Sequence, residues 1–403
     1  MKLFEPLTIN GVTLRNRVVK SAMGEGMAAE DGTVTPAMLR LYERWARGEV
    51  GLAITGMTSV LPGFKMAEGE AGLFNEGHVA AWAELTEAVH CHGGRIFAQL
   101  CHAPPQMLRR RAKELGSWSA SGGLNRTNFL WDKPFSDGQI REVIRAFGHA
   151  AERARRAGFD GVQLHAAHGY MLSRFLSPRF NHRDDDWGGS FGRRVALLEA
   201  TYEAVRRAVG EDFPVTVKLN AHDGPARGGL TLDQSLEIGR QLAAWGIDAI
   251  EVSAGTGDVG MGFYPNRGDI PVDLSKRFLR AELPMYRPIL PILGPILQGV
   301  ARGVAFEEEA YFLNEAKLFA ESLAVPIIAV GGFRSLDVAE AALTETKVSL
   351  VSLARPLVCE PTLPKRWREG KSDRARCINC NRCFVQVGLG EPLHCTGLRD
   401  ERS

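Results

Sequence analysis

The chain has 403 residues, of which 45% are hydrophobic, so it is long enough to bury a large core. Lysine and arginine number 49 against 47 acidic residues, and the net charge of +2 gives no electrostatic footprint for nucleic acid. The length would allow two domains, but α/β barrels also reach this size as one domain.

The N-terminal segment MKLFEPLTINGVTLRN has no continuous apolar stretch, and no run of about 18 apolar residues occurs anywhere in the chain. We therefore expect neither a signal peptide nor a membrane-spanning helix. The chain has seven cysteines, and three of them crowd into CINCNRC near the C-terminus. This pattern favours free thiols or metal ligands over disulfides, and we expect a cytoplasmic protein.

Short apolar runs alternate along the chain with amphipathic segments of helical period. Four helices are predicted in 138–158, 79–93, 191–210 and 232–246, and Gly158 is expected to end the first of them. Eight runs have the length of buried strands: Val18–Met23, Leu52–Val60, Ile96–Leu100, Val162–His165, Val215–Leu219, Ala249–Ser253, Ile327–Val330 and Leu350–Leu353. Eight strand–helix units predict a closed parallel (β/α)8 TIM barrel. An open doubly wound sheet is the alternative, but no strand is followed by a GxGxxG turn.

Three regions fall outside the repeat. Residues 103–135 are predicted to form a long loop rich in Gly, Ser and Asn, and residues 256–306 carry an apolar, proline-broken stretch expected to pack locally or against another copy of the chain. The barrel is expected over residues 1–359. Residues 360–403 would form a C-terminal extension with the cysteine group rather than an independent domain.

The stretch GVQLHAAHGY begins as a strand and ends in three polar rings, His165, His168 and Tyr170. Barrel chemistry is carried where strands run into the loops that follow them. A single histidine there would most simply be a satisfied core residue. The pair at i, i+3 together with Tyr170 favours a binding or catalytic set.

Other strand ends carry groups that suit a planar, phosphorylated cofactor. Gly331–Gly332 and Ala354–Arg355 fit the phosphate site that many barrels build after their last two strands. Gln99 offers an amide donor and a carbonyl acceptor to a heterocycle edge, and Lys218 adds a positive charge. Glycine pairs also serve ordinary tight turns, so these features indicate a cofactor only in combination.

Several long segments of the chain resemble the Old Yellow Enzyme family of FMN-dependent ene reductases. These are LFEPLTINGVTLRNRVV, AGFDGVQLHAAHGYMLSRFLSPRFNHRDDDWGGSFGRR, VGGFRS and SLARPLV, and the resemblance covers most of residues 1–370. It implies a TIM barrel with FMN across the C-terminal mouth. It also implies that NAD(P)H reduces FMN, and that a hydride from flavin N5 then reduces the activated C=C bond of an α,β-unsaturated carbonyl compound.

The resemblance assigns a role to each matching position. His165 and His168 would hold the substrate carbonyl, and Tyr170 would donate the proton. The cofactor contacts would be Ala22, Met23 and Gly56 along the isoalloxazine, Gln99 on its pyrimidine edge, Lys218 near N1 and O2, and Gly332, Ala354 and Arg355 on the phosphate.

Two positions depart from the family pattern. Gly24 stands next to the expected flavin where many members have Thr or Cys, so we expect an altered, lower flavin reduction potential. Lys218 stands where Arg is usual, which keeps the charge but loses the planar fork.

The tail ARCINCNRCF resembles the cluster-binding segment of 2,4-dienoyl-CoA reductase and trimethylamine dehydrogenase. Its expected ligands are Cys377, Cys380, Cys383 and Cys395, although the second and third cysteines are one residue closer than in the family pattern. Cys-x2-Cys-x2-Cys spacing can wrap a 4Fe-4S cluster, and four thiolates also suit zinc. We expect a metal, with iron–sulfur ahead of zinc, while a degenerate site without metal is the alternative.

Those relatives carry further FAD- and dinucleotide-binding domains, which we expect to be absent because the sequence ends at Ser403. NAD(P)H would then reduce FMN directly, or a separate electron-transfer partner would supply the cluster. A dehydrogenase or demethylase passing electrons outward is the alternative enzyme, and a flavin-free binding barrel is the alternative outside catalysis. A homo-oligomer is the default expectation.

Overall fold

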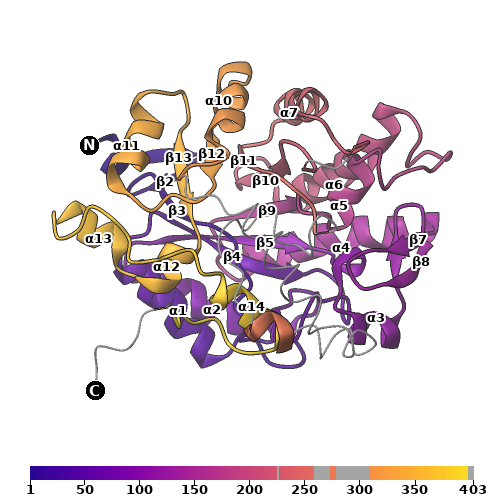
Figure 1. The fold of residues 1–403 in the computed structure, drawn as a ribbon, viewed down its shortest axis with the longest axis horizontal. Coiled ribbons are helices and arrows are strands. Elements are labelled where there is room, and N and C mark those ends of the chain that lie inside the picture. The colour runs from indigo at the N-terminus through magenta and orange to yellow at the C-terminus, as the bar shows by residue number, and fades with distance from the viewer. Residues whose placement is uncertain (225–226, 258–272, 278–308, 398–403) are drawn as a thin grey trace.

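Eight parallel strands close into a barrel in chain order, as the sequence predicts (Figure 1). The computed structural model describes residues 1–224, 227–257, 273–277 and 309–397. The barrel strands are β3 (Val18–Lys20), β4 (Leu52–Ser59), β5 (Arg95–Cys101), β9 (Gly161–Ala166), β10 (Val215–Asn220), β11 (Ala249–Ser253), β12 (Ile327–Val330) and β13 (Leu350–Leu353). Lys218 on β10 lies in register with His165 on β9 and with Glu251 on β11, which puts three polar residues at one level of the barrel.

Helices follow the barrel strands and form its outer layer (Figure 1). Ser136 and Thr231 each build a capping box with a glutamine, which fixes the starts of α4 and α7, and Gly158 with φ 79° follows the end of α4. The four helices predicted from sequence all form. The helices are α1 (Pro36–Arg47), α2 (Gly77–His90), α4 (Asp137–Arg156), α6 (Phe191–Val209), α7 (Leu232–Trp245), α10 (Leu313–Ser322), α11 (Leu336–Thr344), α12 (Arg355–Cys359) and α13 (Leu363–Arg368).

An N-terminal hairpin of β1 (Leu7–Ile9) and β2 (Val12–Leu14) closes one end of the barrel. Its Asn10–Gly11 turn has positive φ at both residues, the conformation that a two-residue hairpin needs. Buried residues of the hairpin pack with residues near the first ends of the barrel strands, including Leu52, Ala249 and Leu350. The polar residues lie at the opposite end of the barrel, where the strands finish.

The segment after β5 differs from its predicted form, because residues 103–135 carry secondary structure of their own. They contain α3 (Arg109–Leu115) and a three-stranded sheet of β6 (Trp118–Ser119), β7 (Gly123–Asn125) and β8 (Leu130–Pro134). Buried polar side chains support it: Asn125 donates to Asp132 at 3.0 Å, and Asn128 donates to Ser117 at 3.3 Å. Hydrogen bonding rather than apolar periodicity shapes this sheet, so the sequence pattern did not reveal it.

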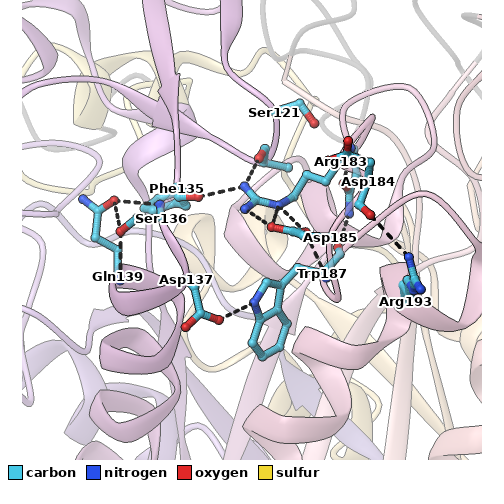
Figure 2. Close-up of polar contacts among 12 residues, drawn as sticks. Ser121, Phe135, Ser136, Asp137, Gln139, Arg183, Asp184, Asp185, Trp187 and Arg193 are labelled. Carbon is cyan, nitrogen blue, oxygen red and sulfur yellow. Dashed lines mark hydrogen bonds and ion pairs between the residues drawn. The ribbon is translucent and has the colours of Figure 1, made fainter.

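The polar stretch NHRDDDWGGS, residues 181–190, anchors this segment to the barrel (Figure 2). The Arg183 guanidinium donates to the carbonyl oxygens of Ala120 at 2.7 Å and Phe135 at 2.8 Å, and to the carboxylate of Asp185 at 2.9 Å. The Trp187 indole donates to Asp137 at 2.9 Å. This stretch therefore positions the loop after β5.

The C-terminal extension packs along α1 and returns to the barrel mouth (Figure 1). Lys365 N donates to the Gly48 carbonyl at 3.1 Å beside α1, and Ala375 N donates to the Arg334 carbonyl at 2.7 Å after β12. Beyond α14 (Arg382–Gly388), Leu393 N donates to the Glu25 carbonyl at 2.7 Å. The apolar stretch expected in 256–306 lies largely outside the described residues.

Candidate active site

The end of β9 brings His165, His168 and Tyr170 together, as the sequence predicts. The ring centres of His165 and His168 are 5.2 Å apart, and those of His165 and Tyr170 are 4.7 Å apart. Only 3% of His165 and 9% of Tyr170 is exposed. The three polar rings therefore form one largely water-excluded cluster at the mouth of the barrel, and their catalytic roles stay a prediction.

His168 is held in an unusual backbone conformation. Its φ is 64°, in the left-handed region that non-glycine residues seldom adopt. Its backbone N–H donates to the Asn220 side chain at 3.2 Å, its carbonyl accepts from Gly257 N at 3.2 Å, and its Nε2 lies 2.7 Å from Ser253 Oγ. The ends of β10 and β11 and the loop after β11 thus hold His168, and Ser253 contacts its ring.

Burial keeps the rings of this cluster uncharged. Burial, with smaller contributions from His168 and Lys218, holds the pKa of His165 well below its usual value. Burial and Lys218 do the same to the pKa of His168, and burial raises the pKa of Tyr170 well above its usual value. His165 Nδ1 accepts from Ala167 N at 3.4 Å, so the hydrogen of its neutral ring is on Nε2.

The Tyr170 hydroxyl has a weak partner in the described structure. It donates to the Met66 sulfur at 3.0 Å, and thioethers accept hydrogen bonds poorly. Tyr170 packs in an apolar cluster with Met57, Cys101 and Ala103. The hydroxyl is therefore available to exchange this contact for one with a substrate.

Gln99 and Lys218, two expected cofactor contacts, belong to one buried hydrogen-bond network. Gln99 Nε2 donates to Gln163 Oε1 at 2.7 Å, and Gln163 Nε2 donates to Glu251 Oε2 at 3.0 Å. Lys218 Nζ lies 3.1 Å from Glu251 Oε1 and donates to Ser21 Oγ at 3.0 Å. Gln163 and the Glu251 carboxylate thus connect Gln99 to Lys218.

Glu25, in the loop after β3, joins that loop to β4 and α1 through its carboxylate. Its Oε1 accepts from Gly56 N at 2.7 Å and from the Tyr42 hydroxyl, and lies 3.5 Å from the fully buried Lys20 Nζ. Burial lowers the pKa of Lys20 to about 8. Gly56 thus packs against the Glu25 carboxylate, where a Cβ would lie 2.2 Å from Oε2, and its expected contact with a flavin stays a prediction.

Ala22, Met23 and Gly24 lie in that same loop, partly buried. A Cβ on Gly24 would have Val387 at 3.7 Å as its nearest neighbour, so this position has room for a side chain. Packing would therefore allow a Thr or Cys side chain here, as in many family members. Glycine instead leaves open space at the position where the resemblance places the flavin.

The loops after β12 and β13 have the features expected of a phosphate site, with one complication. Gly332 has φ 78°, and a Cβ there would lie 2.5 Å from the Tyr311 ring, so only glycine fits. Ala354 precedes α12, and Arg355, a residue that is 6% exposed, donates from its guanidinium to Asn381 Oδ1 at 2.5 Å. Arg355 thus contacts the cysteine segment as well as lying at the expected phosphate end.

The four expected metal ligands line one pocket, and Cys359 joins them. Burial raises the pKa of Cys383 to about 12, and a hydrogen bond with Cys395 contributes most to the raised pKa of Cys359. A Cβ on Gly397 would lie 3.2 Å from the Cys380 sulfur and 3.9 Å from the Cys395 sulfur. The four cysteines are Cys377, Cys380, Cys383 and Cys395.

No single-ion metal site is evident among the described residues, since no group of three or more His, Cys, Asp or Glu side chains there could hold a metal ion. Zinc would need its sulfurs at about 2.3 Å from one point. The pocket nonetheless brings five thiols together, and burial raises the pKa of Cys377 and of Cys383. Whether it binds iron–sulfur, zinc or no metal stays a prediction.

The residues at the barrel mouth fit a group of the FMN type. Arg355 supplies a cation, Gly332 supplies left-handed glycine backbone, and Lys218 and Gln99 supply donors at the floor. Gly24 leaves space beside them. The side chains needed for a phosphate, a planar ring and an imide edge are thus present at one end of the barrel.

A closed parallel barrel with polar groups at the ends of its strands is the architecture of an α/β-barrel enzyme. Residues 2–256 match the model of the NADH:flavin oxidoreductase / NADH oxidase family, and the chain belongs to that family. The predicted relation to Old Yellow Enzymes is thereby confirmed.

Individual relatives agree with this family. The chain is similar to an NADH oxidase of Thermoanaerobacter brockii, with 32% identity over 94% of this chain and 52% of that protein. It is 32% identical to a 4,4'-dithiodibutanoate disulfide reductase of Rhodococcus erythropolis, over 96% of this chain and 93% of that protein. An Old Yellow Enzyme homologue from Zymomonas mobilis shares the fold, with a TM-score of 0.71 and 22% identity over 97% of this chain and 99% of the other. The chain thus spans about half of the first relative and nearly all of the others.

No helix among the described residues is long and apolar enough to cross a membrane.

Three residues of the site were not identified from the sequence. Glu251 and Gln163 stand inside strand patterns, and a charged residue within an apolar strand is itself a signal, because a buried charge needs a partner. Cys359 stands 18 residues before Cys377, too far from the CINCNRC motif for its spacing to reveal it. The fold alone brings it to the pocket.

Proposed function

We propose that this protein binds FMN and uses NAD(P)H to reduce activated C=C bonds of α,β-unsaturated carbonyl compounds. The juxtaposition of His165, His168 and Tyr170 in one buried cluster carries the proposal. Family membership supports it, because the family description names NADH and flavin. The choice of an alkene as substrate rests on the two imidazole donors and the phenol.

His165 and His168 would hold the substrate oxygen. Because His165 Nδ1 accepts a hydrogen bond from Ala167 N, the Nε2–H group of the same ring remains to donate to a substrate. Donors aimed at an oxygen that gains negative charge lower the barrier most in a water-excluded site. Because both rings have a lowered pKa, they serve as neutral donors.

Tyr170 would give the proton to the α-carbon. Its raised pKa keeps the phenol protonated, and its present partner, the Met66 sulfur, competes weakly for the hydrogen. Packing against Met57 and Cys101 excludes water that would otherwise exchange the proton.

FMN, when bound, supplies the hydride that the alkene β-carbon receives. The residues proposed to hold it are Ala22, Met23, Gly24, Gly56, Gln99, Lys218, Gly332, Ala354 and Arg355. Arg355 and the Gly332 backbone would hold the phosphate, while Gln99 and Lys218 would bind the polar edge of the ring.

In the cysteine pocket we propose an iron–sulfur cluster, ahead of zinc. A 4Fe-4S cluster takes four cysteine thiolates, and all four expected ligands line this one pocket. Arg355 lies at both the pocket and the expected phosphate end. That shared residue favours a second candidate function, in which the protein exchanges electrons with a partner protein.

The anaerobic absorption spectrum of the purified protein, with iron and zinc measured on the same sample, tests these proposals. We expect a flavin spectrum that bleaches with NAD(P)H and recovers with an enone. Iron with matching absorbance would support the electron-exchange function. A colourless protein that takes up no FMN would overturn the assignment.

A further inference from the structure

The Glu251 carboxylate is fully buried inside the barrel, and both of its oxygens accept hydrogen bonds. Its Oε1 accepts from Ser21 Oγ at 2.8 Å, Ser352 Oγ at 2.9 Å and Lys218 Nζ at 3.1 Å. Its Oε2 accepts from Gln163 Nε2 at 3.0 Å. Side chains from three strands, β9, β10 and β13, and from the start of the loop after β3 therefore converge on the carboxylate carried by β11.

Glu251 neutralises Lys218. Glu251 is 0% exposed and Lys218 is 3% exposed, so little water screens the two charges. Although burial opposes ionisation, Lys218 and the two serine hydroxyls hold the pKa of Glu251 below its usual value. The floor beneath the expected cofactor therefore carries a neutral pair rather than a free cation.

Glu251 also sets the direction of two amides. An ionised carboxylate only accepts, so Gln163 must turn its NH2 group toward Glu251. Its carbonyl then faces Gln99, which must turn its own NH2 group toward Gln163. Gln99 is left presenting its carbonyl oxygen and one amide hydrogen to a ligand.

We propose that Glu251 is a positioning residue of the flavin site, which acts through Lys218 and Gln99 and lowers the flavin reduction potential. This inference rests on the proposed FMN site. Reduction adds negative charge to the ring, and a free ammonium nearby would favour the reduced form. A Lys218 whose charge is matched by Glu251 favours it less.

Glu251→Gln tests the proposal through the flavin midpoint potential, measured by chemical reduction against a reference dye. Removing the carboxylate leaves Lys218 as an unmatched cation. We expect the equilibrium ratio of reduced to oxidised flavin to rise at least tenfold at a given potential, which is about +30 mV for a two-electron couple. Ser352→Ala, which removes one hydrogen bond and no charge, should change the ratio less than threefold.

The double variant Lys218→Met, Glu251→Gln keeps the proposal testable if the single variant does not fold. It replaces a neutral pair by two neutral side chains, so the potential should stay near the wild-type value. If Lys218 acted as a free cation in the wild type, the double variant would lose at least tenfold in the same ratio, and the proposal would be wrong.

The flavin midpoint potential tests this inference independently of the proposed function, because its measurement needs neither NAD(P)H nor an enone. A protein that binds FMN while Glu251→Gln leaves the potential unchanged overturns only the inference. A protein that takes up no flavin overturns both. A structural role for Glu251 alone would lower thermal stability without moving the potential.

Discussion

The protonation states of a few buried side chains decide what the mouth of the barrel can do. His165 and His168 stay neutral and Tyr170 stays protonated because burial disfavours their charged forms. Two hydrogen-bond donors and one acid are the groups that reduction of an activated alkene requires from the protein. Hydride chemistry is left to the cofactor.

Tyr170→Phe should separate the two halves of the reaction. Without the hydroxyl, proton delivery is lost, and we expect oxidation of the reduced flavin by an enone to slow by ~10²- to 10⁴-fold. Flavin reduction by NAD(P)H should be unchanged. Stopped-flow absorbance of each half-reaction measures both rates, and equal slowing of both would contradict the assigned role. Tyr202→Phe, which removes a hydroxyl that bonds the Trp245 carbonyl on the outer layer, is the matched control.

Glu70 gives the enone half-reaction an expected pH dependence. Burial raises the pKa of Glu70 to about 8, and Glu70 is one cause of the raised pKa of Tyr170. As pH rises through about 8, Glu70 gains a negative charge and makes Tyr170 a weaker acid, so the rate should fall. The raised pKa also lowers stability as pH rises from about 4.5 to about 8, because over that range the unfolded chain has released the proton that the folded Glu70 still holds.

Glu70→Gln should flatten that alkaline limb, whereas Glu68→Gln should not. Glu68 belongs to the same loop, is exposed and pairs with Arg110. The measurement is the pH profile of flavin oxidation by an enone in the three proteins. An unchanged inflection near pH 8 in Glu70→Gln would show that another group titrates there.

Single residues also show where sequence reasoning stops. His165, His168 and Tyr170 could be recognised because they share one strand end. The contact of Gly56 with Glu25 could not be predicted, since it joins β4 to the loop after β3. Likewise, Cys359 reaches the cysteine pocket only because the extension folds back past α12.

Among the elements, regular periodicity was the reliable signal. All eight barrel strands and the four predicted helices form, because each run has either the length of a buried strand or the period of an amphipathic helix. The sheet of β6, β7 and β8 was missed, because paired polar groups such as Asn125 and Asp132 hold it together. Such pairs are separated in sequence and leave no periodic trace.

Arg183→Ala should loosen the segment after β5 while leaving the barrel folded. It removes the donors to the Ala120 and Phe135 carbonyls, and an unpaired buried polar group costs about 1–3 kcal/mol. We expect faster amide hydrogen exchange in residues 117–135. Arg193→Ala is the control in the same stretch, since Arg193 makes one bond, of 3.3 Å, to the Asp184 carbonyl (Figure 2). Equal exchange in both variants would argue against the anchoring role.

On the scale of the whole molecule, the extension connects the cysteine pocket to both ends of the proposed flavin site. Ala375 N bonds the Arg334 carbonyl next to the β12 glycines, and Leu393 N bonds the Glu25 carbonyl behind the β3 loop. Cys377, Cys380 and Cys383 lie between these two contacts along the chain, and Cys395 follows the second contact by two residues. Fixing the pocket therefore restrains the loops that would hold the phosphate and the ring.

Cys380→Ser together with Cys383→Ser should consequently weaken FMN binding, although neither residue is expected to contact FMN. The proposed cluster would close the loop between Cys377 and Cys395, and without it the extension would regain conformational entropy that the barrel contacts must offset. We expect at least a tenfold rise in the FMN dissociation constant, measured by fluorescence of FMN released on ultrafiltration. Cys91→Ser, at an exposed thiol just after α2, should leave FMN binding unchanged. If the double variant retains FMN as the wild type does, the extension carries the cysteines without supporting the flavin site.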